Sequence, residues 1–363
     1  MKLKIMVSLI MVILAAGGTA AVQNYMDRKS EQAYLEAAAA ADQETEQEAF
    51  VEDPDGAAVF GDDLYGEYAS AKKDWIRNKD GSVTYRGKKY RRNTYIKPIL
   101  IVGVDRSGLA EENDVAKNGQ ADAVFLAAED TVRNRLRILM IPRDSVVPIR
   151  HPDGSFTYDH LSLSWAFGDG MKESAVTTRN AVSSLLMDLP VAHYIAMDMA
   201  VLSDITDTVG GVTVTVPNGE LEKQYPSWKM GSQITLHGKD AERFLRYRDL
   251  GTTSSSVFRM QQHRAFIVGL SKAAKKKTKE ESGFTERLYD TLVTHIVTDL
   301  KKGEFLSLCL EGLQSADLTG EDITTLPGIA VPASEEYPWD RIFLNYEEAI
   351  PIILDLFYRE ALA

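Results

Sequence analysis

Three apolar runs of strand length constrain the fold of this chain more than any other feature. Residues 98–104, 123–128 and 136–141 are apolar throughout, apart from Arg137. A continuous apolar run indicates a strand buried on both faces, whereas a strand with one solvent-exposed face alternates polar and apolar residues. Because only a short charged segment joins the second run to the third, we expect them to be neighbours in one sheet.

Segments with helical spacing surround these runs. We expect helices at 171–189, 199–209, 238–247 and 257–275, and further strands at 191–197 and 212–216. Beyond them we expect a helix at 306–313, a loop at 322–327 and a final helix at 346–358. Alternating strands and helices are typical of a sheet covered by helices on both faces. The sequence therefore predicts an α/β fold, an α-β-α layered sandwich with a central mixed sheet.

The N-terminus predicts a membrane segment before this fold. Residues 5–22 carry no charge and follow Lys2 and Lys4. This length and these flanks favour a single-pass transmembrane signal anchor with the remaining chain outside the cytosol. Small residues from Gly17 to Ala21 leave a cleaved secretory signal as the alternative. Both interpretations place the main part of the protein outside the cytosol.

Charge and composition divide the rest of the chain. Residues 41–67 are rich in carboxylates without Lys or Arg, which indicates a solvated stalk, and the basic segment 72–92 predicts a hairpin turning at Arg86-Gly87. The single cysteine, Cys309, excludes a disulfide-built fold, and the net charge of -12 argues against a nucleic acid partner. The predicted division is a cytoplasmic tail 1–4, an anchor 5–22, a stalk 23–70, a basic hairpin 71–97, a main domain 98–275 and a C-terminal helical extension 276–363.

Two aspartates stand at ends of the buried strands. Asp105 follows the first apolar run, and Asp122 begins the second. If these strands are adjacent and antiparallel, both carboxylates lie at one edge of the sheet. Two hard oxygen ligands suit Mg²⁺, which completes its shell with substrate phosphate and water. The alternative is that each aspartate only caps a turn.

Four arginines also stand at ends of predicted elements, namely Arg143, Arg246, Arg248 and Arg259. In a chain of negative net charge this placement indicates an anionic ligand, because guanidinium groups match phosphate oxygens with two parallel hydrogen bonds. A helix N-terminus next to Arg259 would add backbone donors. Surface ion pairs with Asp144 and Asp249 are the alternative.

Five motifs, taken in order, resemble the LytR-CpsA-Psr family between residues 98 and 270. They are Ile99 to Arg106, Gln120-Ala121-Asp122, Ile141-Pro142-Arg143-Asp144, Val209-Gly210-Gly211-Val212, and Arg246-Tyr247-Arg248 followed by Arg259. The resemblance implies a phosphotransferase that moves a glycopolymer, such as teichoic acid or capsule, from a polyprenyl-pyrophosphate carrier to peptidoglycan. It further implies Mg²⁺ or Mn²⁺, an apolar pocket for the lipid tail, contact with membrane lipid, and a Gram-positive type of envelope.

The resemblance also implies residue roles. Asp105 and Asp122 would hold the metal. The expected pyrophosphate-binding residues are Arg106, Gln120, Arg143, Arg246, Arg248, Arg259 and His263. The expected catalytic residues are Asp105, Arg143, Asp144, Arg246 and Arg248, and either Asp105 or Asp144 is the candidate to take the proton of the acceptor hydroxyl.

The chain departs from the family pattern at several of these positions. Gln120 and Gln262 stand where many members have arginine, and His263 stands where glutamine is common. On a helix Arg259 and His263 share a face, so we expect His263 to reach the site and to become cationic there. His160 and Ser162 replace a Lys-x-Asn element. These departures leave open a binding scaffold with reduced catalysis. A pyrophosphatase that uses water as acceptor is a second alternative.

Overall fold

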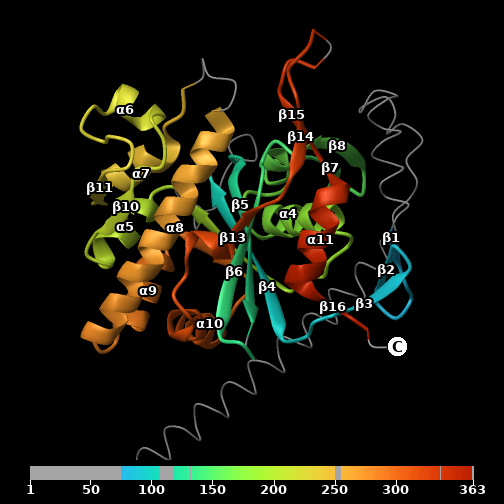
Figure 1. Ribbon diagram of the computed structural model, residues 1–363, viewed down its shortest axis with the longest axis horizontal. Coiled ribbons are helices and arrows are strands. Elements are labelled where there is room, and N and C mark those ends of the chain that lie inside the picture. Colours follow the sequence, from blue (N-terminus) through green and yellow to red (C-terminus); the bar gives the residue numbers. More distant parts are fainter. Residues whose placement is uncertain (1–74, 107–117, 131, 250–254, 336, 362–363) are drawn as a thin grey trace, which may run out of the picture.

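A six-stranded sheet forms the centre of the molecule (Figure 1). The structure is a computed structural model that describes residues 75–106, 118–130, 132–249, 255–335 and 337–361. The strand order is β12-β9-β4-β5-β6-β13. The strands are β4 (Ile96–Val104), β5 (Ala121–Asp130), β6 (Arg135–Ile141), β9 (His193–Asp198), β12 (Ile296–Thr298) and β13 (Ile323–Thr325).

The sheet is mixed, as predicted. Strand β5 pairs antiparallel with both β4 and β6, and β12 pairs antiparallel with β9. In contrast, β9 runs parallel to β4, and β13 runs parallel to β6. The three apolar runs are therefore the central neighbours of one sheet, and the end of β4 lies beside the start of β5.

Helices cover both faces of this sheet (Figure 1). One face carries α4 (Lys172–Leu185) and α11 (Tyr346–Phe357). The other carries α5 (Val201–Thr208), α7 (Lys239–Arg246), α8 (Ser255–Glu280), α9 (Phe284–Leu292) and α10 (Lys302–Gln314). This arrangement confirms the layered α-β-α sandwich.

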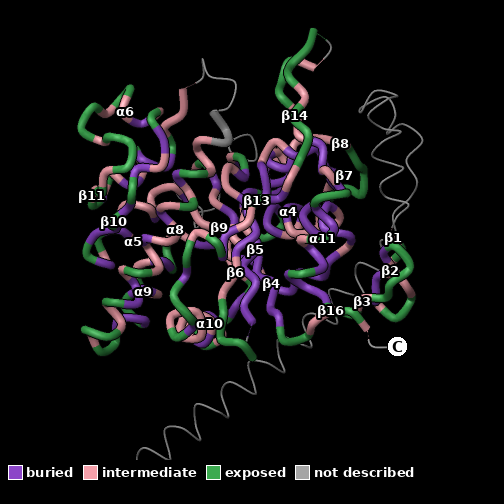
Figure 2. The backbone as a smooth tube through the Cα atoms, viewed as in Figure 1, coloured by how far each residue is buried: buried purple, intermediate pink, exposed green. Residues whose placement is uncertain are grey.

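Side chains alternate between the two faces along the central strands. Leu100, Val102 and Leu126 are fully buried and join the core that includes α4 and α11. Ile101 and Phe125, one residue away, are only partly buried and point toward the α8 side. In Figure 2 the buried segments gather along the central strands and on the α4 and α11 side. One face of the sheet is therefore packed full, whereas the other is not.

A second sheet joins the two ends of the described chain. Its strands are β1 (Trp75–Arg77), β2 (Val83–Tyr85), β3 (Lys88–Arg92) and β16 (Tyr358–Glu360), in that order. The hairpin of β2 and β3 turns at Arg86-Gly87, as predicted, and both turn residues have positive φ angles of 48° and 77°. Two consecutive positive angles are typical of a type I′ turn, in which glycine is favoured.

Short ribbons and single turns complete the fold. The ribbons are β7 (Val146–Arg150) with β8 (Phe156–His160), β10 (Val212–Thr215) with β11 (Gln233–Leu236), and β14 (Gly328–Val331) with β15 (Arg341–Leu344). The helical turns are η2 (Leu161–Ser164), α6 (Glu220–Gln224) and η3 (Gly320–Asp322). The strand expected at 212–216 is thus part of a ribbon outside the central sheet.

The C-terminal part differs from the prediction in two ways. The loop expected at 322–327 was wrong, because Ile323–Thr325 form β13 and pair with β6. The segment expected to be a helical extension also supplies β12, β14, β15 and β16, and the expected boundary at residue 275 falls inside α8. Strands of three or four residues are too short to produce a periodic pattern in the sequence. Whether such a segment forms a strand therefore depends on the strand with which it pairs.

The predicted tail, anchor and stalk lie outside the described residues. Among the helices of the described ranges, none is both long and apolar enough to cross a bilayer.

Candidate active site

Asp105 and Asp122 lie at the same edge of the central sheet. Val104 pairs with Ala121 after a bulge at Gly103, and the Asp105 amide donates to the Gln120 carbonyl at 3.0 Å. Because β4 and β5 are antiparallel neighbours, the residue after one strand meets the start of the other. The predicted geometry is therefore present, and the metal role that was inferred from it stays a prediction.

Three arginines contact these two carboxylates. Arg246 Nη2 lies 3.1 Å from Asp105 Oδ1. Arg143 donates to Asp122, and Arg259 Nη1 lies 3.7 Å from the second oxygen, Oδ2, of the same residue. The arginines come from the end of β6, the last turn of α7 and the first turns of α8. Elements distant in sequence thus converge on one charged cluster.

The cluster holds guanidinium groups close to one another as well as to carboxylates. The Arg259 side chain is 11% exposed, and burial together with the neighbouring Arg143 lowers its pKa below the ordinary arginine value. Asp122 acts in the opposite direction, and Arg248 adds to the repulsion. Arg246 differs, because its hydrogen bond to Glu242 raises its pKa. Repulsion around Arg259 is the kind that a bound dianion relieves.

This cluster forms the mouth of a cavity of about 780 Å³, which we call the main cavity. Its mouth is lined by Asp105, Gln120, Asp122, Arg143, Arg246, Arg248 and Arg259. Its interior is lined by apolar side chains of the sheet and of α5, α7 and α8, among them Ile101, Phe125, Leu202, Phe266, Ile267 and Leu270. The main cavity can therefore take a molecule with an anionic head and a long apolar part.

The side chains at the mouth supply some of the ligands that a hard divalent cation needs. Asp105 and Asp122 supply carboxylate oxygens, the ligand type that Mg²⁺ prefers. In the described part of the chain, no cluster of three or more His, Cys, Asp or Glu residues is arranged to hold a metal. An ion here would therefore complete its shell with substrate and water oxygens, as Mg²⁺ commonly does.

A comparison of the sequence with family profiles decides the classification. Residues 63–331 match the profile of the LytR_cpsA_psr (LytR-CpsA-Psr) family. The chain belongs to this family. The match covers most of the chain and includes every motif on which the resemblance rested.

Individual members of the family agree with this classification. The chain is 32% identical over 151 residues to the polyisoprenyl-teichoic acid–peptidoglycan teichoic acid transferase TagU of Bacillus subtilis. That match covers 41% of this chain and 43% of TagU, so the aligned region spans less than half of that relative.

Solved structures of similar fold agree with the fold expected of this family. A Streptococcus agalactiae protein, gbs0355, superposes with a TM-score of 0.56 at 18% identity over 72% of this chain and 88% of that one. TagT bound to LIIa-WTA gives a TM-score of 0.55 at 19% identity over 72% and 89%. At these identities the likeness shows the shared LytR-CpsA-Psr fold.

His263 occupies a different environment from the one predicted. It lines the main cavity, but its Nε2 lies 3.2 Å from the Leu245 carbonyl oxygen and its ring meets Phe125 edge to face. Burial and the nearby Arg259 lower its pKa to about 4. The expectation that His263 becomes cationic is therefore wrong at neutral pH, where it is a neutral residue between the mouth and the apolar interior.

Gln262, another departure from the family pattern, lies outside the main cavity. It is 1% exposed, and with its amide group turned so that the nitrogen faces the end of α7, it donates to the carbonyl oxygens of Phe244 and Tyr247 at 3.2 Å. These carbonyls belong to the end of α7, where helix acceptors lack partners. In this chain the residue therefore fixes α7 against α8 and adds nothing to the charge of the mouth.

Two other predicted residues lie beside the mouth. Asp144 Oδ1 is 3.3 Å from Arg143 Nε, so it contacts the cluster through an arginine. Arg106 follows Asp105, but its guanidinium lies near Gly170 and Asn118, and it is absent from the cavity lining among the described residues. The structure therefore does not place Arg106 with the other predicted pyrophosphate-binding residues.

The sequence analysis missed one carboxylate, that of Asp198. It ends β9, is 2% exposed, lines the main cavity and pairs with Val104 across the sheet. His295 Nδ1 lies 3.1 Å from Asp198 Oδ1, and His295 Nε2 lies 3.1 Å from Asp204. The signal that pointed to Asp105, an acid directly after a buried strand, was present at Asp198 too. No local signal pointed to His295.

Proposed function

We propose that this protein is a membrane-anchored, extracytoplasmic transferase that moves a glycopolymer from a polyprenyl-pyrophosphate carrier to peptidoglycan. The observation that carries the proposal is the main cavity, which combines a mouth of carboxylates and arginines with an apolar interior. A carrier lipid has the same two parts, an anionic pyrophosphate and a long hydrocarbon chain. The name of the relative TagU, a teichoic acid transferase, supports teichoic acid as the type of glycopolymer.

The mouth supplies the charges that such a transfer needs. Asp105 and Asp122 are the residues that would hold Mg²⁺, which would polarise the phosphoryl oxygens when bound. Arg246 and Arg143 pair with these carboxylates in the structure, and their remaining donors can bind the pyrophosphate. Phosphoryl transfer depends mainly on position and charge neutralisation, so no nucleophilic side chain is required.

The proposed reaction is a substitution at phosphorus. A hydroxyl oxygen of peptidoglycan forms a bond to the phosphorus that carries the glycan, and the bond from this phosphorus to the bridging oxygen breaks. Polyprenyl monophosphate leaves with the bridging oxygen, while the hydroxyl proton goes to a nearby carboxylate. The two candidates for that base are Asp105, which lines the mouth, and Asp144, which contacts the mouth through Arg143 and would stay free of the metal.

The transfer assay is the direct test. The full-length chain is incubated with a polyprenyl-pyrophosphate glycan, peptidoglycan and Mg²⁺, and the glycan attached to peptidoglycan is measured. We expect Asp122→Asn and Arg246→Ala to lower the transfer rate roughly 100- to 1,000-fold, as losing a charge-stabilising group typically does. Asp290→Asn is the matched control, because this carboxylate is 67% exposed and pairs only with Lys302 among the described residues.

Two other results would overturn the proposal. Donor binding without transfer by the wild-type chain would show a binding scaffold. Release of polyprenyl phosphate at the same rate with and without peptidoglycan would show a pyrophosphatase that uses water.

A further inference from the structure

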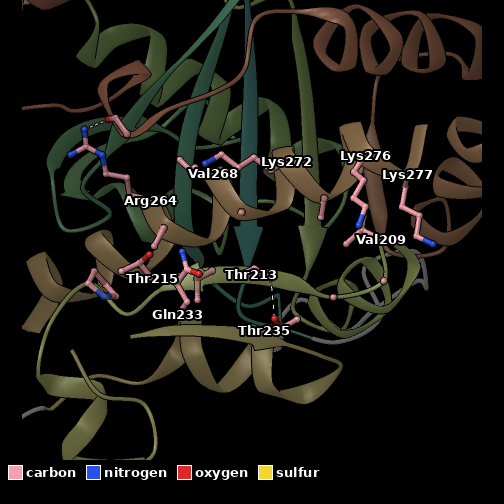
Figure 3. Close-up of a pocket in the computed structure, with 18 of the residues that line it drawn as sticks. Val209, Thr213, Thr215, Gln233, Thr235, Arg264, Val268, Lys272, Lys276 and Lys277 are labelled. Atoms are coloured by element: carbon pink, nitrogen blue, oxygen red, sulfur yellow. Dashed lines mark hydrogen bonds between the residues drawn. The ribbon is translucent and has the colours of Figure 1, made fainter. Parts of the chain in front are cut away.

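A second cavity, which we call the α8 groove, lies on the opposite side of α8 from the main cavity. It has a volume of about 860 Å³ and runs between α8 and the ribbon of β10 and β11 (Figure 3). Helix residues Arg259, His263 and Phe266 line the main cavity, whereas Arg264, Val268 and Lys272 line the groove. One helix therefore separates the two cavities.

The groove exists because α8 touches the ribbon closely at one point. A Cβ atom added to Gly269 would lie 2.5 Å from the Thr213 carbonyl oxygen. Glycine at this position lets helix and strand meet, and longer side chains on both sides of the contact form the walls. Figure 3 shows Lys276 and Lys277 extending from α8 beside the ribbon, with Thr213, Thr235 and Gln233 below the helix.

The groove is basic in a chain whose net charge is negative. Of the residues that the structure describes, its lining contains Arg264, Lys272, Lys276 and Lys277 but a single acid, Glu280. Lys276 pairs with Glu280 at 3.8 Å, and Arg264 donates to the Gly320 carbonyl. Within the part of the chain that the structure describes, no carboxylate lies within ion-pair distance of Lys272 or Lys277. These two ammonium groups are the ones available to an anionic ligand.

The dimensions and chemistry of the groove select the type of ligand. From Arg264 to Lys276 the helix rises about 18 Å at its usual pitch, which is long enough for several charged groups in a row. The lining offers hydroxyl and amide groups, from Thr213, Thr215, Thr235, Gln233 and Gln261, and among the described residues it contains no aromatic side chain. Sugar rings and nucleobases commonly stack on aromatic side chains, so the groove suits the charged backbone of a polymer.

We propose that the α8 groove binds the phosphodiester backbone of the glycopolymer, at a distance from its reacting end. This inference rests on the proposed function, since the polymer is the substrate there. Lys272 and Lys277 would pair with different phosphates of the same backbone, because residues five apart on a helix point to different sides of it. The threonines of the ribbon would donate hydrogen bonds to these phosphates. A membrane surface is the less suitable occupant, because the basic groups lie in a groove and no aromatic side chain accompanies them.

Binding of a soluble oligomer tests this site apart from catalysis. The probe is a synthetic glycerol phosphate oligomer with no lipid and no pyrophosphate, titrated calorimetrically into the full-length chain. We expect the double variant Lys272→Gln/Lys277→Gln to bind about tenfold more weakly, the loss expected for charge-assisted contacts worth about 1.4 kcal/mol together. Lys279→Gln, an exposed lysine of α8 outside the groove, should bind as the wild type does.

Further arms separate this inference from the proposed function and from other ligands. Arg246→Ala, which removes an arginine from the mouth of the main cavity, should bind the oligomer as the wild type does. Loss of transfer and loss of binding in the groove are therefore measured independently. Unchanged oligomer binding by the double lysine variant would overturn the inference. An affinity for inorganic phosphate equal to that for the oligomer would also overturn it. So would a double variant that loses binding to phosphatidylglycerol vesicles while its binding to the oligomer is unchanged.

Discussion

The two faces of the central sheet differ in how completely they are packed. On the α4 and α11 face, Leu100 and Leu126 are fully buried in one continuous core. On the α8 face, the neighbouring Ile101 and Phe125 line the main cavity. The same strands therefore contribute to a packed core on one face and line the main cavity on the other. Substitutions on the two faces should separate these contributions.

The largest effect on stability is expected on the packed face. Leu126→Ala should lower the free energy of unfolding by about 2–5 kcal/mol, because it leaves a cavity in a core without access to water. Urea unfolding of the full-length chain measures this, and transfer per folded molecule should stay near the wild-type value. A loss below about 1 kcal/mol would mean that this face is not tightly packed.

An intermediate effect is expected at the far end of β5, where α10 closes the α8 face. Glu129 pairs with Lys97 across the sheet and is 6% exposed, while Lys97 Nζ lies 2.9 Å from Glu311. Burial, with the nearby Glu311, raises the pKa of Glu129 to about 8. Between pH 4.5, the ordinary pKa of this carboxyl group, and pH 8, the folded state holds a proton that the unfolded state has lost. The free energy of unfolding therefore falls as the pH rises through this range.

Glu129→Gln should remove that pH dependence. Urea midpoints at pH 6 and pH 8.5 should then differ less in the variant than in the wild-type chain, and the variant should gain most at the higher pH. An identical pH dependence in both proteins would show that another group is responsible.

The smallest effect on stability is expected inside the main cavity. Leu270→Ala should cost about 1 kcal/mol or less, because Leu270 already borders open space and its truncation creates little new cavity. If the cavity holds the lipid tail, the same change should raise the KM for a long-chain donor more than for a short-chain one, with little change in kcat. Equal KM changes for both donors would argue against a tail at this position.

Comparison with the sequence analysis shows which features local patterns can predict. The apolar runs predicted the central strands, and their charged ends predicted the edge where Asp105 meets Asp122. The short strand β13 was missed, since three residues carry no period of their own and only pairing with β6 defines them. Similarly, helical spacing placed His263 on the face of Arg259, but only the surrounding atoms show that burial keeps it neutral.

The sequence by itself determined the layered α/β fold and most of the charged residues at the mouth of the main cavity. These follow from local rules, because a doubly buried strand must be apolar and its charged ends must reach the surface. The tertiary structure decided which apolar side chains fill a core and which line a cavity, since Leu126 and Phe125 are equally apolar in sequence. It also decided the pairing of Asp198 with His295 and the groove beside α8, because both depend on contacts between distant segments.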